Sequence, residues 1–320
     1  MSAEPLPEII STPHPHFDDG RVLWDDAYSG EYSPVPYGQQ FDDQWRLFLE
    51  KRPGFHRHTG VETSDPWIDG RIYELTGQAN YLARKRWGPL FPLVRFLRNR
   101  SGNGEARRGI GGRLYLEPKF SIDHFRGKRC LDVGCGAGRW TRTLLALGAE
   151  VKSIDVSTHG LESTRRFNLD VERVDVFGLA KRQDLHEAFD LVVCWGVLMC
   201  THDPKLAFEN VARTVRPGGE LYIMVYAPTY HCSEQVLAWR RHYHRELSTF
   251  EERLAYAYEI ADQPENCINL LDMLNTYYNW VIPEDVAHGW YRDHGFADVV
   301  TLNAKEPHNC GWHVLGRKQA

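Results

Sequence analysis

A turn with three glycines at alternate positions constrains this chain more than any other feature of its sequence. Residues 130–140 read CLDVGCGAGRW, in which Gly134, Gly136 and Gly138 follow directly on an apolar run that carries Asp132. Glycine has no Cβ atom, so a turn of this kind lets a ligand come close to bare backbone. The sequence therefore predicts a buried strand that ends in a ligand-binding turn.

Segments typical of strands alternate with segments typical of helices on both sides of this turn. The predicted strands cover residues 128–133, 150–156, 168–176, 189–195 and 220–226, and the predicted helices between them cover 137–147, 158–168 and 203–215. Repeated strand–helix units predict a parallel sheet with helices on both faces. A helix over 283–295 and two strands over 296–302 and 311–316 complete the pattern, and the short loop between these strands predicts an antiparallel hairpin at the edge.

The fold class expected is therefore α/β, with helical additions before the sheet and after its fifth strand. Residues 228–282 are rich in Tyr, His and Trp, and we expect helices over 233–246, 250–262 and 268–279. Residues 1–40 predict an extended arm, residues 41–100 have a helical period, and residues 101–113 resemble a flexible connection. We divide the chain into an N-terminal arm and helical lid over 1–110 and a ligand-binding domain over 111–320, which contains the 228–282 insert.

Composition narrows the classes of function. No apolar run approaches the ~18 residues of a membrane span, and the N-terminus lacks the basic start and apolar stretch of a secretory signal. The seven cysteines are scattered without metal-ligand spacing, so we expect reduced thiols, a cytoplasmic location and no metal. A net charge of −5 argues against a protein built mainly to hold nucleic acid, although residues 84–113 carry nine Arg and Lys against Glu105 alone. That stretch is either an anion-binding or RNA-facing patch or a solvated linker that follows an amphipathic helix.

The residues around the glycines exclude two common phosphate-binding loops. A Walker loop needs a Lys followed by Ser or Thr after its last glycine, where this chain has Arg139 and Trp140. A dinucleotide-binding loop needs the spacing G-x-G-x-x-G, whereas the glycines here are spaced G-x-G-x-G. The turn therefore favours a ligand without phosphate.

Carboxylates at three predicted strand ends indicate a nucleoside that carries positive charge. Asp155 ends the second strand, where it is suited to accept hydrogen bonds from ribose hydroxyls, and Asp175 ends the third, where it is suited to an adenine amino group. Asp132, just before the glycines, can help to hold an ammonium group or an ordered water. S-adenosylmethionine combines a ribose, an adenine, an ammonium and a sulfonium, and is the cofactor that we expect.

Five motifs in succession resemble those of class I S-adenosylmethionine-dependent methyltransferases: LDVGCGAG, SIDVS, VDVFGL, FDLVVCWGVLMCTHDP and VRPGGELYIMVY. The resemblance covers about residues 128–226 and implies a Rossmann-like, seven-stranded, mostly parallel sheet with an antiparallel last strand. It also implies cofactor contacts from Asp132, Gly134, Gly136, Gly138, Asp155, Asp175, Val176, Cys194 and Gly196, those of Cys194–Gly196 through backbone. The N-terminal helix and the insert resemble bacterial small-molecule methyltransferases of this class.

The loop after the fourth strand departs from the family pattern. Relatives often carry two adjacent histidines where this chain has Met199 and Cys200, so a general base inherited from that position is not expected. The nearest titratable candidate is His202. We expect the catalytic candidates to be His202, Tyr226 and His231, and the acceptor-binding candidates to be Gln44, Trp45, Tyr230, Tyr277, Tyr278 and Asn279.

The sequence thus predicts an enzyme that transfers a methyl group to O, N, S or C of a small metabolite by in-line displacement and releases S-adenosylhomocysteine. The N-terminal helices and the insert would exclude water from the strand ends and align the acceptor. Two alternatives stay open. One is a tRNA-type RNA methyltransferase that uses the basic stretch 84–113, and the other is a non-catalytic protein that binds the cofactor.

Overall fold

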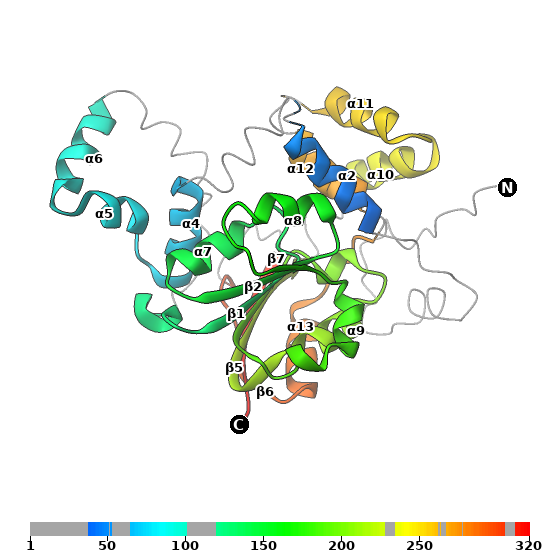
Figure 1. Cartoon of the computed structure of the whole chain (residues 1–320). Helices are drawn as coiled ribbons and strands as arrows, with labels where there is room; N and C mark the ends of the chain where they lie inside the picture. Colours follow the sequence, from blue (N-terminus) through cyan, green and yellow to red (C-terminus); the bar gives the residue numbers. More distant parts are fainter. Residues whose placement is uncertain are drawn as a thin grey trace.

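Seven strands form one mixed sheet at the centre of the molecule (Figure 1). The computed structural model describes residues 38–50, 52, 65–100, 120–227, 234–261, 263, 267–276, 278–304 and 311–320. The strands are β1 (Arg129–Val133), β2 (Glu150–Asp155), β3 (Val171–Arg173), β4 (Phe189–Trp195), β5 (Val215–Tyr226), β6 (Phe296–Thr301) and β7 (Gly311–Lys318). Their order across the sheet is β3-β2-β1-β4-β5-β7-β6.

The chain direction within this sheet places a ligand site beside β1. The strands β1 to β5 pair in parallel, whereas β7 runs antiparallel to both of its neighbours, β5 and β6. The expected seven-stranded sheet with a reversed last strand is confirmed. The strand order reverses between β1 and β4, and ligands of open parallel sheets bind beyond the carboxyl ends of the strands at such a point.

Helices cover both faces of the sheet and bury its apolar residues. On one face, Ile72 of α4 and Leu144 of α7 share a core with Val193 of β4. On the other, Phe208 of α9 and Tyr291 of α13 pack against the second set of strand residues. These helices and α8 are α4 (Asp65–Thr76), α7 (Arg139–Ala146), α8 (Thr158–Thr164), α9 (Pro204–Ala212) and α13 (Glu284–Asp293).

Four further helices form a small unit that we call the cap: α2 (Gly38–Leu49), α10 (Glu234–Arg245), α11 (Phe250–Ile260) and α12 (Cys267–Asn275). Although α2 is some 190 residues before α10 in the chain, the two lie together in Figure 1. Leu47 of α2 is buried in one apolar cluster with Tyr243, Leu254 and Leu271 from the other three helices. The cap therefore has its own core, separate from the two cores of the sheet.

Two strand boundaries differ from the sequence prediction. β3 is only three residues long, so Asp175 lies beyond it, where its carboxylate caps the 3-10 helix η5 (Val176–Lys181) by accepting a hydrogen bond from the N–H of Phe177 at 2.8 Å. β5 begins at Val215, five residues before the predicted start, and runs through the Pro217–Gly219 turn. Gly218 adopts φ +73°, and the register between β4 and β5 shifts there, so these residues form an irregular start of the strand.

Two helix boundaries also differ, each for a local reason. α7 begins at Arg139 rather than at residue 137, because Gly138 is in the left-handed region with φ +90° and cannot extend the helix. α12 ends at Asn275, four residues before the predicted end. The buried guanidinium of Arg240 donates to the carbonyls of Met273 and Thr276, so these groups are satisfied without a further helical turn.

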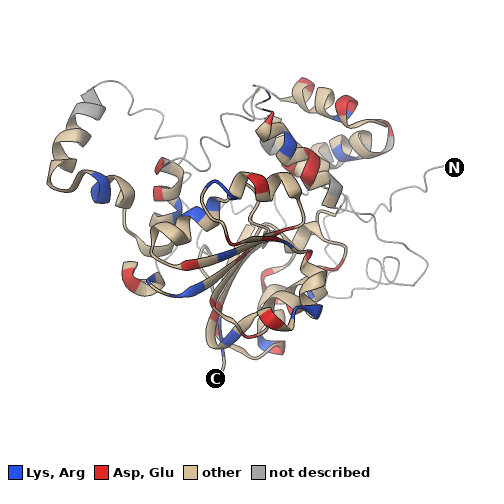
Figure 2. Ribbon diagram, in the orientation of Figure 1, with Lys and Arg blue, Asp and Glu red and all other residues tan. Residues whose placement is uncertain are grey.

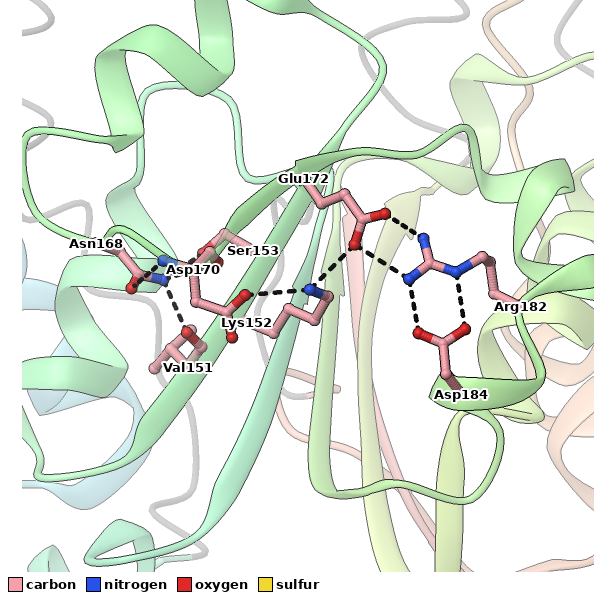
Figure 3. Close-up of polar contacts among 8 residues, drawn as sticks. All are labelled: Val151, Lys152, Ser153, Asn168, Asp170, Glu172, Arg182 and Asp184. Atoms are coloured by element: carbon pink, nitrogen blue, oxygen red, sulfur yellow. Dashed lines mark hydrogen bonds and ion pairs between the residues drawn. The ribbon is translucent and has the colours of Figure 1, made fainter.

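A polar network closes the β3 side of the sheet (Figure 3). The Nζ atom of Lys152 on β2 lies 3.0 Å from Glu172 on β3 and 3.1 Å from Asp170. Glu172 also pairs with Arg182, which in turn pairs with Asp184 at 2.7 Å. Because Arg182 directly follows η5, the network fixes the segment that carries Asp175.

Several expectations fall on residues outside the described ranges, namely the arm over 1–37, the connection over 101–113 and the loop of the terminal hairpin. The proposed boundary at residue 110 lies there as well. Among the helices of the described residues, none combines the length and the apolar character that crossing a membrane requires.

Candidate active site

The glycine turn brings the backbone of the β1–α7 connection into close contact with two other segments. Gly134 has φ +69°, and a Cβ atom there would lie 2.2 Å from Val197 Cγ2 in the loop after β4. Gly136 has φ +49°, and a Cβ atom there would lie 2.3 Å from Trp45 Cζ2 of α2. No other residue fits either position without displacing its neighbour. The glycines are therefore required by the packing of the protein itself as well as by a ligand.

Asp155 at the end of β2 holds the turn in place. One carboxylate oxygen accepts a hydrogen bond from the N–H of Gly136 at 2.7 Å, and the other accepts one from the N–H of Ser157 at 2.7 Å. Burial raises the pKa of Asp155 to about 6, although the hydrogen bonds from Ser157 and Gly136 act in the opposite direction. Each oxygen keeps a second lone pair, so the same carboxylate can hold the turn and accept from a ribose hydroxyl.

Asp132 is buried beneath the turn, where it forms a polar chain with two hydroxyl groups. Thr141 of α7 donates to the Asp132 carboxylate at 2.6 Å, and its hydroxyl lies 2.8 Å from that of Ser153 on β2. Burial raises the pKa of Asp132 to about 6, against the effect of its hydrogen bonds with Thr141. In this structure Asp132 braces α7 against β1 and β2 from below the turn.

The end of β3 and the loop after β4 meet at His202. Its ring stacks on that of Phe177, with the ring centroids 4.1 Å apart, and lies 6.2 Å from the ring of Tyr278. Burial lowers the pKa of His202, while the negative charge of Asp175 acts against this shift. The imidazole is therefore neutral at pH 7 and able to accept a proton. Val176, beside Asp175, is buried in the core of the sheet.

α2 lies directly over the glycine turn. The indole of Trp45 contacts both Gly136 and Gly160, and the backbone of Gly38 packs against Val156, the residue after Asp155. Of the acceptor-binding candidates, the structure thus places Trp45 against the turn. Because the ring lies on bare backbone, it shields the turn from solvent.

A second contact of α2 involves a residue that the sequence did not single out. The Asp42 carboxylate accepts from the Ser157 hydroxyl at 2.8 Å and from the N–H of His159 at 3.1 Å, and lies 2.9 Å from the His159 ring. Burial would raise the pKa of Asp42, but the hydrogen bonds and the charge of His159 lower it overall. Asp42 thus caps the first turn of α8 from a different helix. No local pattern near residue 42 could reveal this, because its partners are some 115 residues away.

Two buried side-chain amides lie in or beside the cap. Gln44 donates from Nε2 to Asp272 of α12 at 3.0 Å, which fixes the orientation of its amide. Its Oε1 atom and Oδ1 of Asn279, just after α12, are buried and accept no hydrogen bond from any described residue. A buried polar atom without a partner is costly, so these two oxygens are suited to a ligand that brings donors.

The exit of the insert is fastened to the strand ends. Trp280 donates from its backbone to the carbonyl of Met199 at 3.0 Å and from its indole to that of Thr201 at 2.8 Å. The N–H of Ile282 donates to the carbonyl of Tyr226, the last residue of β5, at 2.9 Å. Tyr226 and Tyr278 are both buried at this junction. The segment after α12 therefore lies between the cap and the carboxyl ends of β4 and β5.

The other site candidates divide into two groups. The side chain of Cys194 lies in the core of the sheet, so only its backbone can face a ligand, and Gly196 adopts φ +78° just after β4. Tyr230, His231 and Tyr277 lie outside the described residues. In the described part of the chain, no group of three or more His, Cys, Asp or Glu side chains could hold a metal ion.

These residues fit an adenosyl sulfonium ligand. Beside β1 the structure offers exposed peptide groups at close-packed glycines, a carboxylate with free lone pairs and a second buried carboxylate below. Two buried carboxylates whose pKa values are raised favour a ligand that brings positive charge, because a cation stabilises their ionised form.

Comparison with known proteins points to the same ligand. Residues 112–259 match the family model described as "Methyltransferase domain". The chain is 36% identical to the ubiquinone biosynthesis O-methyltransferase of Burkholderia ambifaria over 107 residues, which cover 31% of this chain and 44% of that protein. It is also 36% identical to the protein of the same name from Xanthomonas oryzae pv. oryzae over 105 residues, which cover 30% of this chain and 42% of that protein. Each match spans less than half of the relative.

Among solved structures, a methyltransferase from Mesorhizobium loti is 17% identical, with a TM-score of 0.39, and the overlap covers 61% of this chain and 92% of that chain. A possible histamine N-methyltransferase from Thermotoga maritima is 13% identical, with a TM-score of 0.38 and coverage of 60% and 83%. The family match and the sheet order β3-β2-β1-β4-β5-β7-β6 agree with the five sequence motifs. The chain thus carries a class I S-adenosylmethionine-dependent methyltransferase domain.

Proposed function

We propose that this protein transfers a methyl group from S-adenosylmethionine to a hydroxyl group of a small molecule held between the sheet and the cap. The observation that carries this proposal is the contact of Trp45 with Gly136, because it places the cofactor turn beneath a lid that belongs to the chain itself. A lid of this kind excludes water from the reacting atoms and limits the acceptor to a molecule that fits below it.

The choice of a hydroxyl acceptor rests on the amide oxygens of Gln44 and Asn279. Both are buried hydrogen-bond acceptors, so they are suited to a molecule that brings O–H or N–H groups. The relatives from Burkholderia ambifaria and Xanthomonas oryzae pv. oryzae are named O-methyltransferases, which favours oxygen over nitrogen. A thioether or carbon acceptor would satisfy neither oxygen.

The cofactor supplies the methyl group on a cationic sulfur, and the residues of the chain position the acceptor and remove its proton. A hydroxyl group must lose its proton as the methyl group arrives, which calls for a base near the strand ends. His202 is half-buried there with a neutral imidazole, and Tyr226 lies at the end of β5. We therefore assign the role of general base to His202, and that of an acceptor contact to Tyr226.

The acceptor class is tested by release of S-adenosylhomocysteine from matched panels of phenols, amines and thiols of similar size. We expect turnover with a phenol or catechol and none with the corresponding thioether. Turnover confined to amines or thioethers would contradict the hydroxyl assignment. Binding of S-adenosylmethionine without turnover on any panel would favour the non-catalytic alternative.

The acceptor site is tested with Asn279→Leu. We expect KM for the acceptor to rise about tenfold or more, which corresponds to a lost hydrogen bond of about 1.5 kcal/mol, while the affinity for S-adenosylmethionine stays unchanged. Asn210→Leu is the matched control, because Asn210 is equally buried and its Oδ1 atom also lacks a partner among the described residues, but it lies on α9 below the sheet. Equal effects of both substitutions would show that the loss is one of stability.

The base is tested with His202→Gln. We expect kcat to fall by about 10²-fold or more with little change in KM, and the loss to shrink at high pH, where the acceptor ionises by itself. An unchanged kcat would remove His202 from the mechanism and leave Tyr226 and His231 as the candidates to test.

A further inference from the structure

A short helical projection stands apart from both the sheet and the cap. It consists of α5 (Tyr81–Trp87), the 3-10 helix η2 (Gly88–Leu90) and α6 (Phe91–Arg100), and we call these residues the arm. In Figure 1 α5 and α6 extend beyond α4, away from the sheet. Nothing in the proposed methyl transfer uses this part of the chain.

The arm exposes large apolar side chains. Among the described residues, seven large hydrophobic side chains are exposed, and four of them belong to the arm: Trp87, Leu90, Leu93 and Phe96. The exposed fractions of Leu90, Leu93 and Phe96 are 59%, 56% and 56%. Their spacing of three residues places them along one side of the helical chain. An exposed apolar stripe of this kind marks a surface that contacts something other than water.

The charge of the arm differs from that of the whole chain. No acidic residue occurs between Glu74 and Glu105, whereas the arm carries six basic residues in a protein whose net charge is −5. Figure 2 shows this contrast as blue on α5 with no red on α5 or α6. Two of the basic side chains lie against rings of the arm itself, Arg84 over Phe91 at 5.6 Å and Lys85 over Tyr81 at 5.8 Å.

We propose that the arm docks this protein on an anionic lipid surface. Leu90, Leu93 and Phe96 would enter the boundary between headgroups and acyl chains, with Arg84 and Lys85 at the lipid phosphates. A short helical element that combines exposed Leu and Phe with basic residues binds such a surface through buried apolar area and through attraction to anionic headgroups. The protein would lie on the surface rather than cross it.

A lipid surface explains the arm better than RNA does. Phosphates of either ligand would attract the arginines, but RNA is recognised by hydrogen bonds and by stacking on aromatic or guanidinium planes. Aliphatic side chains such as Leu90 and Leu93 provide neither. They gain free energy when they enter an apolar layer, and this is the property that distinguishes the two ligands.

The proposal is tested by co-sedimentation of the full chain with vesicles of phosphatidylcholine alone or mixed with phosphatidylglycerol. We expect binding to the mixed vesicles, at least about tenfold weaker binding to phosphatidylcholine alone, and weakening with salt. The variant with Leu90→Ser, Leu93→Ser and Phe96→Ser should lose binding, and the variant with Arg84→Gln and Lys85→Gln should retain only salt-independent residual binding. Leu169→Ser is the matched control, because Leu169 is 90% exposed but lies between α8 and β3.

Three results would overturn the proposal. The first is no sedimentation of the wild-type protein with anionic vesicles at low salt. The second is equal sedimentation of the triple serine variant, with its melting temperature and affinity for S-adenosylmethionine unchanged. The third is a short RNA, or a second copy of the chain, that binds the arm while vesicles do not. Since the substituted residues are exposed and outside the cofactor site, loss of vesicle binding can be separated from loss of methyl transfer.

Discussion

The glycine turn and the cap are built in opposite ways, although they touch at Gly136. The turn is formed by residues close in sequence, and it presents backbone groups whose positions follow from φ angles and hydrogen bonds. The cap is formed by segments some 190 residues apart, and it presents side chains such as Trp45, Gln44 and Asn279. The part that binds a constant ligand is local and made of main chain, whereas the part that faces the acceptor is assembled by tertiary packing.

The strongest test of this contrast is Gly136→Val. A side chain there would collide with Trp45 and would also require a left-handed backbone at φ +49°, so we expect at least about a 100-fold loss of affinity for S-adenosylmethionine. Isothermal titration calorimetry measures the loss. Gly127→Ala is the matched control, because Gly127 has φ +69° but no atom within 4 Å of its would-be Cβ. If both variants bind equally, close approach at the turn is not what the glycine provides.

The next test separates the carboxylate from the turn that it holds. Asp155→Asn replaces one accepting oxygen with an NH2 group, which must then face the N–H of Gly136 or of Ser157. We expect a loss of affinity for S-adenosylmethionine of about 10- to 100-fold, typical of a broken hydrogen bond to a charged group. Wild-type affinity in this variant would show that neither the turn nor the ribose depends on the charge.

The pH dependence of cofactor binding sharpens the same half of the comparison. The pKa values of Asp132 and Asp155 are raised to about 6 by burial, and a cationic ligand favours their ionised forms. Binding below pH 6 must therefore release protons, so the affinity should fall by up to about tenfold per pH unit for each carboxyl involved. Titration calorimetry in buffers of different ionisation enthalpy detects these protons. Constant affinity and no proton release between pH 5 and 8 would contradict the prediction.

The connection between the two halves is tested with Asp42→Ala. This substitution removes the cap that α2 provides for α8, and we expect the free energy of unfolding to fall by about 1–2 kcal/mol, with faster hydrogen exchange in residues 38–49. Asp43→Ala is the control, because Asp43 makes only an exposed ion pair with Arg46 at 3.6 Å. Equal losses of stability in the two variants would show that Asp42 has no special part in holding α2.

The smallest effect is expected at the β3 edge shown in Figure 3. Lys152→Met breaks two ion pairs with partly exposed acids, and such pairs contribute about 0–1 kcal/mol each. Urea denaturation should therefore show a loss below about 1.5 kcal/mol, with little change in the affinity for S-adenosylmethionine. A large loss of affinity would mean that this network positions Asp175 more tightly than the geometry of the cap on η5 indicates.

The sequence by itself determined the sheet and the place of the cofactor turn. The alternation of strands and helices depends on local periodicity, and the boundaries of β4 and the stripe of Trp140, Leu144 and Leu147 on α7 are predicted correctly for that reason. The errors occur where a distant group intervenes. Arg240 ends α12 early, and the register between β4 and β5 lets β5 begin at Val215.

Only the tertiary structure decided what closes the site. Sequence position suggested Gln44 and Trp45, but it could not show that Trp45 rests on Gly136, that Asp42 caps α8 or that Asn279 lies beside the strand ends with a buried, unpartnered oxygen. These contacts join residues that are often more than 90 positions apart, and no periodic pattern records which distant surfaces meet. Backbone conformation is encoded by neighbours in the chain, whereas complementary packing is encoded by the whole fold.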